Sequence, residues 1–231
     1  ASIERLDNVC LDIVRADRQE SLSFEELRTR AREFAVWLMR SCGIRVGDRI
    51  AILGRNRVDW DVALWGVVLA GGIPVLIDPE RPVEGVTNHV NHTETRLIVM
   101  ANDYQNEDSR QELREFASSR DIALIEMTAH EKIVLDEAGV NELLGGIPGE
   151  IQPDQTAVIL CTSGTTGDPR EVELTHKNLI ANLDGTVEKI RITSDDVLGH
   201  ILPPHHSFGM TVGKLLVLAV GARSVYTNKY R

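Results

Sequence analysis

Several features are missing from this 231-residue sequence, and each absence argues against a class of protein. Its three cysteines, Cys10, Cys42 and Cys161, are odd in number, far apart and form no Cys-x-x-Cys pair, which favours a reducing, cytoplasmic compartment over a secreted disulfide scaffold. No apolar run is long enough to cross a bilayer and no basic-then-apolar leader opens the chain, so we expect no transmembrane segment. The 25 basic and 35 acidic residues give a net charge of −10 without a basic stripe, which argues against nucleic acid as the main partner.

Strand-like and helix-like segments alternate along the first part of the chain. Short apolar runs predict buried strands at residues 49–53, 73–77, 97–100 and 122–125. Apolar residues at helical spacing, or helix-start signals, predict helices that cover residues 24–42, 60–68, 82–92 and 111–119. This alternation predicts an α/β fold, a doubly wound sheet with helices on both faces.

The sequence also indicates where one helix starts, what precedes it and where the first part of the chain ends. Ser23 with Glu26 three residues later forms a capping-box pattern at the start of a helix. Before it, Ile3, Leu6, Cys10, Ile13 and Val14 recur at helical spacing, which predicts an amphipathic helix at the N-terminus. Residues 145–153 hold three glycines and two prolines, so we expect a linker there that separates a first α/β subdomain, residues 1–150, from a second, residues 151–231.

The most informative stretch lies at the start of that second subdomain. A buried strand is predicted at residues 156–160, and a half-exposed strand at residues 171–174. The connection between them contains small and hydroxylated residues: Thr162, Ser163, Gly164, Thr165, Thr166 and Gly167. Glycines allow close approach of a ligand, and hydroxyl and backbone N–H groups in such a turn can bind an anion. Arg170 adds a cation suited to phosphate oxygens.

The same composition is also typical of an ordinary turn between two strands. The stretch is not a P-loop of the GxxxxGK[ST] type, because no Gly-Lys-Ser/Thr tripeptide is present and a strand, not a helix, is predicted to follow. Composition alone therefore leaves polyphosphate binding and a plain turn as alternatives.

The ordered string Thr-Ser-Gly-Thr-Thr-Gly-x-Pro, a basic residue, then Leu-Thr-His-x-Asn-Leu resembles the motif of the adenylate-forming enzymes. The residues 22–38, 47–53 and 70–82 also resemble the opening subdomain of that family. The resemblance implies the N-terminal part of the large domain of such an enzyme, truncated within its second subdomain. The sequence departs from the family pattern in two places, since Arg170 and Glu171 stand where Lys-Gly is usual, and Cys161 stands where an aromatic residue is common. Glu171 removes a flexible glycine and adds a negative charge close to the proposed phosphate site.

A second segment, Pro-Pro-His-His-Ser-Phe-Gly-Met at residues 203–210, follows a predicted strand at 197–202. Open α/β sheets bind ligands just beyond the carboxyl ends of their strands. On residues alone, a tight Pro-Pro turn with a solvated histidine and Phe208 in the core is the favoured alternative. The segment resembles that of acyl-CoA synthetases and luciferases, which implies that His205, His206, Ser207, Phe208 and Gly209 line the site of a carboxylic acid. Amino-acid-activating relatives have an aspartate-containing segment here, which this sequence lacks, so a fatty or aromatic acid is the expected substrate.

The resemblance implies a two-step activation with ATP, Mg²⁺ and coenzyme A. The acid attacks the α-phosphorus of ATP to form an acyl-adenylate, and a thiol then displaces AMP. In this scheme residues 162–167 and Arg170 hold the phosphates, and Thr165 lies toward Mg²⁺ through the phosphates. His206 is the catalytic residue that orients the acid or the α-phosphate, and Phe208 shapes the acyl pocket.

Two further patterns carry weaker hypotheses. His89 and His92 have a spacing that can hold a metal, but without a further ligand nearby we expect an exposed helix face. Cys161 has no implied partner base, so a small buried thiol at a strand end is expected in preference to a nucleophile.

Three functions remain open from the sequence: part of an acyl-CoA synthetase, a non-catalytic nucleotide- or acyl-binding module of the same fold, and a luciferase-like enzyme or fatty-acyl-AMP ligase. In the family, the adenine pocket, the ribose-binding carboxylate and the C-terminal lysine follow the point where this chain ends. We therefore expect the 231-residue chain alone to be inactive, and its uncovered apolar surface to favour dimers or aggregation.

Overall fold

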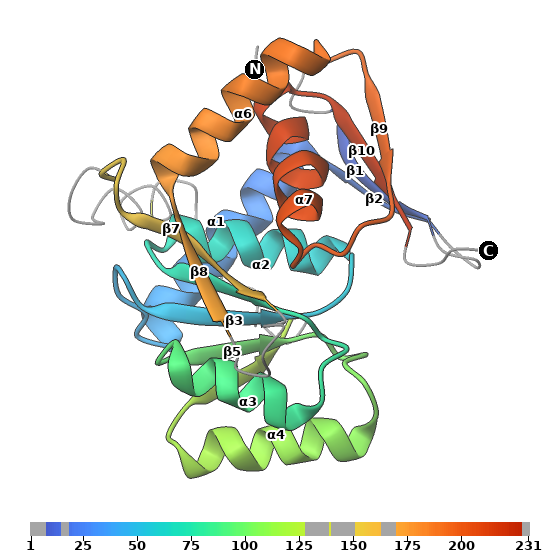
Figure 1. Ribbon diagram of the computed structural model, residues 1–231. Helices are drawn as coiled ribbons and strands as arrows, with labels where there is room; N and C mark the ends of the chain where they lie inside the picture. The colour runs from blue at the N-terminus through green and yellow to red at the C-terminus, as the bar shows by residue number, and fades with distance from the viewer. Residues whose placement is uncertain (1–7, 15–18, 128–138, 140–150, 163–169, 228–231) are drawn as a thin grey trace.

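The larger of two β-sheets forms the centre of the molecule (Figure 1). The structure is a computed structural model that describes residues 8–14, 19–127, 139, 151–162 and 170–227, without the side chain of Thr162. This sheet has the order β6-β5-β3-β4-β7-β8, and all neighbouring strands are parallel except the β7–β8 pair. Its strands are β3 (Arg49–Leu53), β4 (Ile73–Ile77), β5 (Leu97–Met100), β6 (Ala123–Glu126), β7 (Thr156–Thr162) and β8 (Arg170–Thr175).

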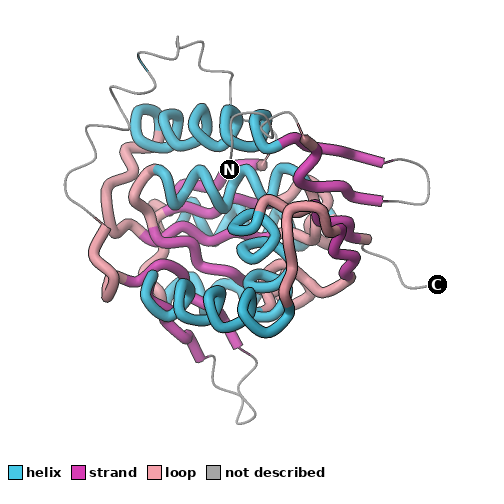
Figure 2. Tube along the Cα trace, turned by 90° about the horizontal axis from the view of Figure 1, so that it is seen from above, coloured by secondary structure: helices cyan, strands magenta, loops and turns pink. Residues whose placement is uncertain are grey.

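Helices cover both faces of this sheet, as Figures 1 and 2 show. One face packs against α1 (Phe24–Ser41) and α2 (Val58–Leu69), and the other against α3 (Val83–His92) and α4 (Glu107–Ser119). Strand β3 shows the reason, because alternate side chains of a strand point to opposite faces. Ile50 and Ile52 belong to the first core, whereas Ala51 and Leu53 belong to the second. The predicted doubly wound α/β fold is confirmed.

Local signals set the helix starts. The Ser23 hydroxyl accepts from Glu26 N at 3.1 Å, and the Glu26 carboxylate accepts from Ser23 N at 2.8 Å, which confirms the capping box. Helix α4 begins at Glu107, earlier than predicted, because the Asn106 side chain caps it by accepting from Ser109 N.

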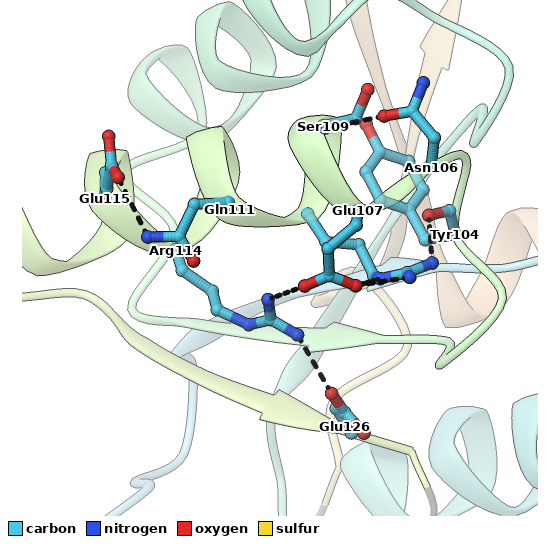
Figure 3. Close-up of polar contacts among 9 residues, drawn as sticks. Tyr104, Asn106, Glu107, Ser109, Gln111, Arg114, Glu115 and Glu126 are labelled. Atoms are coloured by element: carbon cyan, nitrogen blue, oxygen red, sulfur yellow. Dashed lines mark hydrogen bonds and ion pairs between the residues drawn. The ribbon is translucent and has the colours of Figure 1, made fainter.

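Helix α4 is also tied to the edge strand beside it (Figure 3). Arg114 reaches Glu107 on its own helix at 2.9 Å and Glu126 at the end of β6 at 3.2 Å. These contacts are partly exposed and therefore stabilise only weakly. The cover of this face comes from buried apolar residues of α3 and α4.

The smaller sheet contradicts the predicted N-terminal helix at Cys10, Ile13 and Val14, whereas Ile3 and Leu6 of that prediction lie outside the described residues. Its order is β2-β1-β10-β9, with β1 (Val9–Val14), β2 (Gln19–Ser23), β9 (Val197–His200) and β10 (Arg223–Tyr226). The helical spacing was misleading because pairing with β2 and β10 buries residues on both faces of β1, including Asp12. The Asp12 carboxylate is held by Gln19, Ser21 and Arg223, so a polar residue within the strand is satisfied. Long-range pairing overrode the local pattern.

The last elements connect the two sheets. Helix α6 (His176–Ile190) is capped by the Thr175 side chain, which accepts from Asn178 N, and its Ile180 and Ile190 side chains are more than half exposed. After β9 come α7 (Ser207–Met210), the π-helix η2 (Thr211–Leu216) and α8 (Val217–Val220).

Both sheets contain strands from each side of residue 150. A division into subdomains at that point stays a prediction.

Candidate functional site

The Pro-Pro-His-His segment leads from β9 into α7, as the sequence predicts. His206 is the N-cap of α7, and its Nδ1 accepts from Phe208 N at 3.4 Å. His206, Ser207 and Phe208 are exposed, with 54% of Phe208 accessible, whereas Gly209 is buried. The alternative that Phe208 belongs to the core is therefore wrong.

This segment packs against the carboxyl edge of the larger sheet. Asn56, just after β3, donates its side-chain N–H to the Leu202 carbonyl at 2.9 Å. Asp78, the first residue after β4, lies with its Oδ1 3.5 Å from Nε2 of His205. Since ligands of open α/β sheets bind beyond the carboxyl ends of strands, the segment has the position of a binding site.

The predicted phosphate loop starts from the same edge. Residues 163–169, with Ser163, Gly164, Thr165, Thr166 and Gly167, lie outside the described residues. The strand ends on either side of this loop are described, and Thr162 pairs with Arg170, which is exposed. Because β7 runs parallel beside β4, the chain enters the loop next to the strand end that carries Asp78. The fold thus brings the two predicted motifs to neighbouring strand ends.

His205 is a mostly buried histidine next to a carboxylate. Burial lowers its pKa, and the charge of Asp78 acts in the opposite direction. A separation of 3.5 Å is too long for a good hydrogen bond, so the pairing with Asp78 is weak. A neutral imidazole at neutral pH follows from this balance.

Close packing against the Pro-Pro turn leaves no room for a side chain at Gly209. A Cβ at this position would fall far inside van der Waals contact with the carbonyl oxygen of Pro203. The start of α7 thus lies directly on the Pro-Pro turn. A direct contact of Gly209 with an acid stays a prediction.

Glu171, which replaces the usual glycine, turns toward α3. Its Oε1 lies 2.7 Å from Nδ1 of His89 and 3.7 Å from Nδ1 of His92. His89 is fully buried, so the expected exposed helix face is wrong for this residue. Burial lowers the pKa of His89 although Glu171 acts in the opposite direction. The contact holds the extra carboxylate against α3.

Cys161 is a buried thiol at the end of β7, as predicted. Burial, with a further contribution from the charge of Glu171, raises its pKa to about 12. A thiol that stays protonated at neutral pH is a poor nucleophile, which argues against a covalent role.

Asn56 and Asp78 contact the candidate segment, and the sequence did not single them out. Each lies within three residues of the end of a buried, parallel strand, and that position was the available signal. Their partners lie 146 residues away for Asn56 and more than a hundred for Asp78. Only the tertiary structure shows these contacts.

A solved structure has the same architecture. The fatty acyl-adenylate ligase from L. pneumophila, in complex with acyl adenylate and pyrophosphate, superposes with a TM-score of 0.79 at 21% sequence identity. The match covers 98% of this chain and 38% of that chain. The fold is therefore that of the adenylate-forming enzymes.

The family follows from the sequence comparison: a family model described as AMP-binding enzyme matches residues 4–231, and the chain belongs to this family. The mitochondrial malonate–CoA ligase of Homo sapiens is 28% identical, over 94% of this chain and 37% of that protein. A long-chain-fatty-acid–CoA ligase of Escherichia coli O6:H1 is 24% identical, over 92% of this chain and 43% of that protein. The chain spans less than half the length of these CoA ligases.

A membrane-spanning helix is not found in the part of the chain that the structure describes.

Proposed function

We propose that this chain belongs to an ATP-dependent carboxylic acid–CoA ligase and supplies its phosphate loop and part of its acid-binding site. The observation that carries the proposal is the placement of two motifs at neighbouring strand ends. His205 lies against Asp78 after β4, and the adjacent β7 leads into the Thr/Gly-rich loop. A phosphate site and an acid site must be adjacent for a carboxylate to attack the α-phosphorus.

Bound ATP, with Mg²⁺, supplies an electrophilic phosphorus and a pyrophosphate leaving group, so that an acyl-adenylate forms before a thiol, coenzyme A, displaces AMP. Residues 162–167 and Arg170 would hold the phosphates, with Thr165 toward Mg²⁺. The described residues fit an anion here, because Arg170 is exposed and the carboxylate of Glu171 is held by His89.

The acid would bind at residues 205–209. His206 would orient the carboxylate or the α-phosphate, and its exposed ring is accessible to a ligand. Phe208 would shape the acyl pocket, and its exposed ring favours this role over a core position. His205, Ser207 and Gly209 would complete this part of the site. Fatty and aromatic acids are the proposed substrates, and the name of the human relative adds malonate to the acids worth testing.

The test is acid-dependent exchange of pyrophosphate into ATP by the full-length protein, with octanoate, benzoate and malonate as separate substrates. We expect exchange with at least one acid. Phe208→Ala should change the ratio of kcat/KM between acids at least fivefold, with KM for ATP within twofold. Phe116→Ala is the matched control, because Phe116 packs partly buried on α4 and should leave the ratio unchanged. Absence of exchange with every acid, in a protein that is folded, would contradict the proposal.

A further inference from the structure

A buried cluster of charge and aromatic rings lies between α2 and the helical segment that follows Phe208. Lys214 in η2 is 0% exposed and Asp61 in α2 is 1% exposed. Nζ of Lys214 lies 2.8 and 2.9 Å from the two carboxylate oxygens of Asp61. The Tyr226 hydroxyl donates to the same carboxylate, and Nζ lies 4.1 Å from the centre of the Tyr226 ring. The cluster joins the layer of the larger sheet to a strand of the smaller one.

An ion pair in a protein interior constrains geometry more than apolar packing does. Apolar side chains can repack against new apolar neighbours, whereas a buried ammonium that loses its carboxylate leaves two uncompensated charges. A large change in the rotation or register of the helical segment would take Nζ away from Asp61. Buried polar residues are known to fix register between helices in this way.

The smaller sheet also contacts this turn of η2, through β9 and β10. The Gly213 carbonyl accepts from the Ser224 hydroxyl of β10 at 2.9 Å. The His200 ring lies so close to Gly213 that a Cβ there would overlap it. A π-helix has a wider turn than an α-helix and commonly occurs near functional sites. Here the wide turn lies where Lys214 reaches Asp61 and Gly213 meets β9.

This segment is continuous with the candidate acid site. Residues 207–220 are helical without a break, and Lys214 lies eight positions after His206. The rotation of the helix at Lys214 therefore sets where His206 and Phe208 lie relative to the strand ends that carry Asn56 and Asp78.

We propose that Lys214 and Asp61 form a positioning pair that holds the His206–Phe208 turn in place for acid binding. This rests on the proposed function, because it assumes that the turn contacts the acid. The pair does not touch the acid itself: it acts through the helix.

The first measurement is hydrogen–deuterium exchange on this chain. Lys214→Met with Asp61→Leu replaces both charges by apolar groups, which removes the pair without leaving a lone buried charge. Amides of residues 205–213 should exchange at least tenfold faster, while those of β3 change less than twofold. Leu113→Ala, in the core on the opposite face, is the control for lost stability. It should not speed the exchange of residues 205–213 more than that of the rest of the chain. An unchanged pattern, or an equal increase throughout the chain, would overturn the positioning role.

Two further measurements cover other outcomes. If the double variant does not fold, Tyr226→Phe can be used, because it retains the ion pair and removes only the hydroxyl. It should speed exchange of residues 205–213 two- to threefold, and no change there would also overturn the proposal. In the full-length protein the double variant should raise KM for the acid at least fivefold with KM for ATP within twofold. If the unaltered protein shows no acid-dependent pyrophosphate exchange, the proposed function fails, and the positioning of the turn is still decided by the exchange pattern of residues 205–213.

Discussion

At the scale of single residues, burial controls the chemistry of the three thiols. Burial raises the pKa of Cys10 and of Cys161 to about 12, and it also raises the pKa of the less buried Cys42. Alkylation requires the thiolate. Iodoacetamide at pH 8 should therefore modify Cys42 first in the folded chain, and Cys10 and Cys161 at least about tenfold more slowly.

Peptide mass spectrometry against time measures these rates, and the urea-unfolded chain, in which all three thiols should react alike, is the control. Fast modification of Cys161 in the folded chain would reveal an activated thiol and restore the nucleophile hypothesis.

His200 makes stability depend on pH. Burial, with the nearby charge of Lys214, lowers its pKa to about 4, against about 6.5 for an exposed histidine. Below pH 6.5 the unfolded chain binds a proton that the folded chain excludes, so stability falls as pH decreases from 6.5 to about 4 and is unaffected by this group below that. The loss should amount to roughly 3.5 kcal/mol at most, since one pKa unit corresponds to about 1.4 kcal/mol.

Urea unfolding at pH 7 and pH 4.5 tests this, with His200→Leu for comparison. The variant has no titrating group at this position, so its free energy of unfolding should change less between the two pH values. Equal changes in the two proteins would show that His200 titrates normally.

At the scale of elements, two glycines in helices should respond to alanine in opposite ways. Gly209 lies on the Pro203 carbonyl, so a methyl group there forces the start of α7 away from the Pro-Pro turn. Gly209→Ala should cost roughly 1–3 kcal/mol, as overpacking usually does. Gly185, inside α6, has open space at its Cβ position, and Gly185→Ala should stabilise the protein by about 0.5–1 kcal/mol.

Chemical denaturation of both variants and the unaltered chain measures the two effects. A neutral Gly209→Ala would mean that the Pro-Pro turn yields easily and does not hold α7.

At the scale of the whole molecule, the two sheets depend on strands from distant parts of the chain. β10 lies between β1 and β9, and β7 lies between β4 and β8. Residues 1–150 expressed alone therefore lack both strands, and Asp61 loses its buried partner Lys214. We expect this segment to unfold without a cooperative transition, because β1 and β4 each lose one of their two neighbouring strands and leave apolar surface and backbone groups exposed.

Circular dichroism during urea titration measures cooperativity, and addition of residues 151–231 should restore it. A steep transition in residues 1–150 alone would contradict this expectation and show that the first predicted subdomain folds independently of residues 151–231.

The part of the fold that the sequence determined by itself is the part with strong local signals. β3 and β5 are short apolar runs buried on both faces, and Ser23 and Thr175 cap helices through their own side chains. Hydrophobic period and capping chemistry act over a few residues, so they can be read without the tertiary structure. The two motifs of the candidate site were also visible as ordered strings, and their family resemblance is confirmed over residues 4–231.

What only the tertiary structure decided depends on partners far away in the chain. β1 is a strand because β10, more than two hundred residues later, pairs with it. Glu171 lies against α3 because its carboxylate accepts a hydrogen bond from the buried His89 ring, and Lys214 is buried because Asp61 neutralises its charge. A local pattern specifies what a residue prefers, but the free energy of burying a charge or pairing a strand depends on what lies opposite, and that is set by the fold.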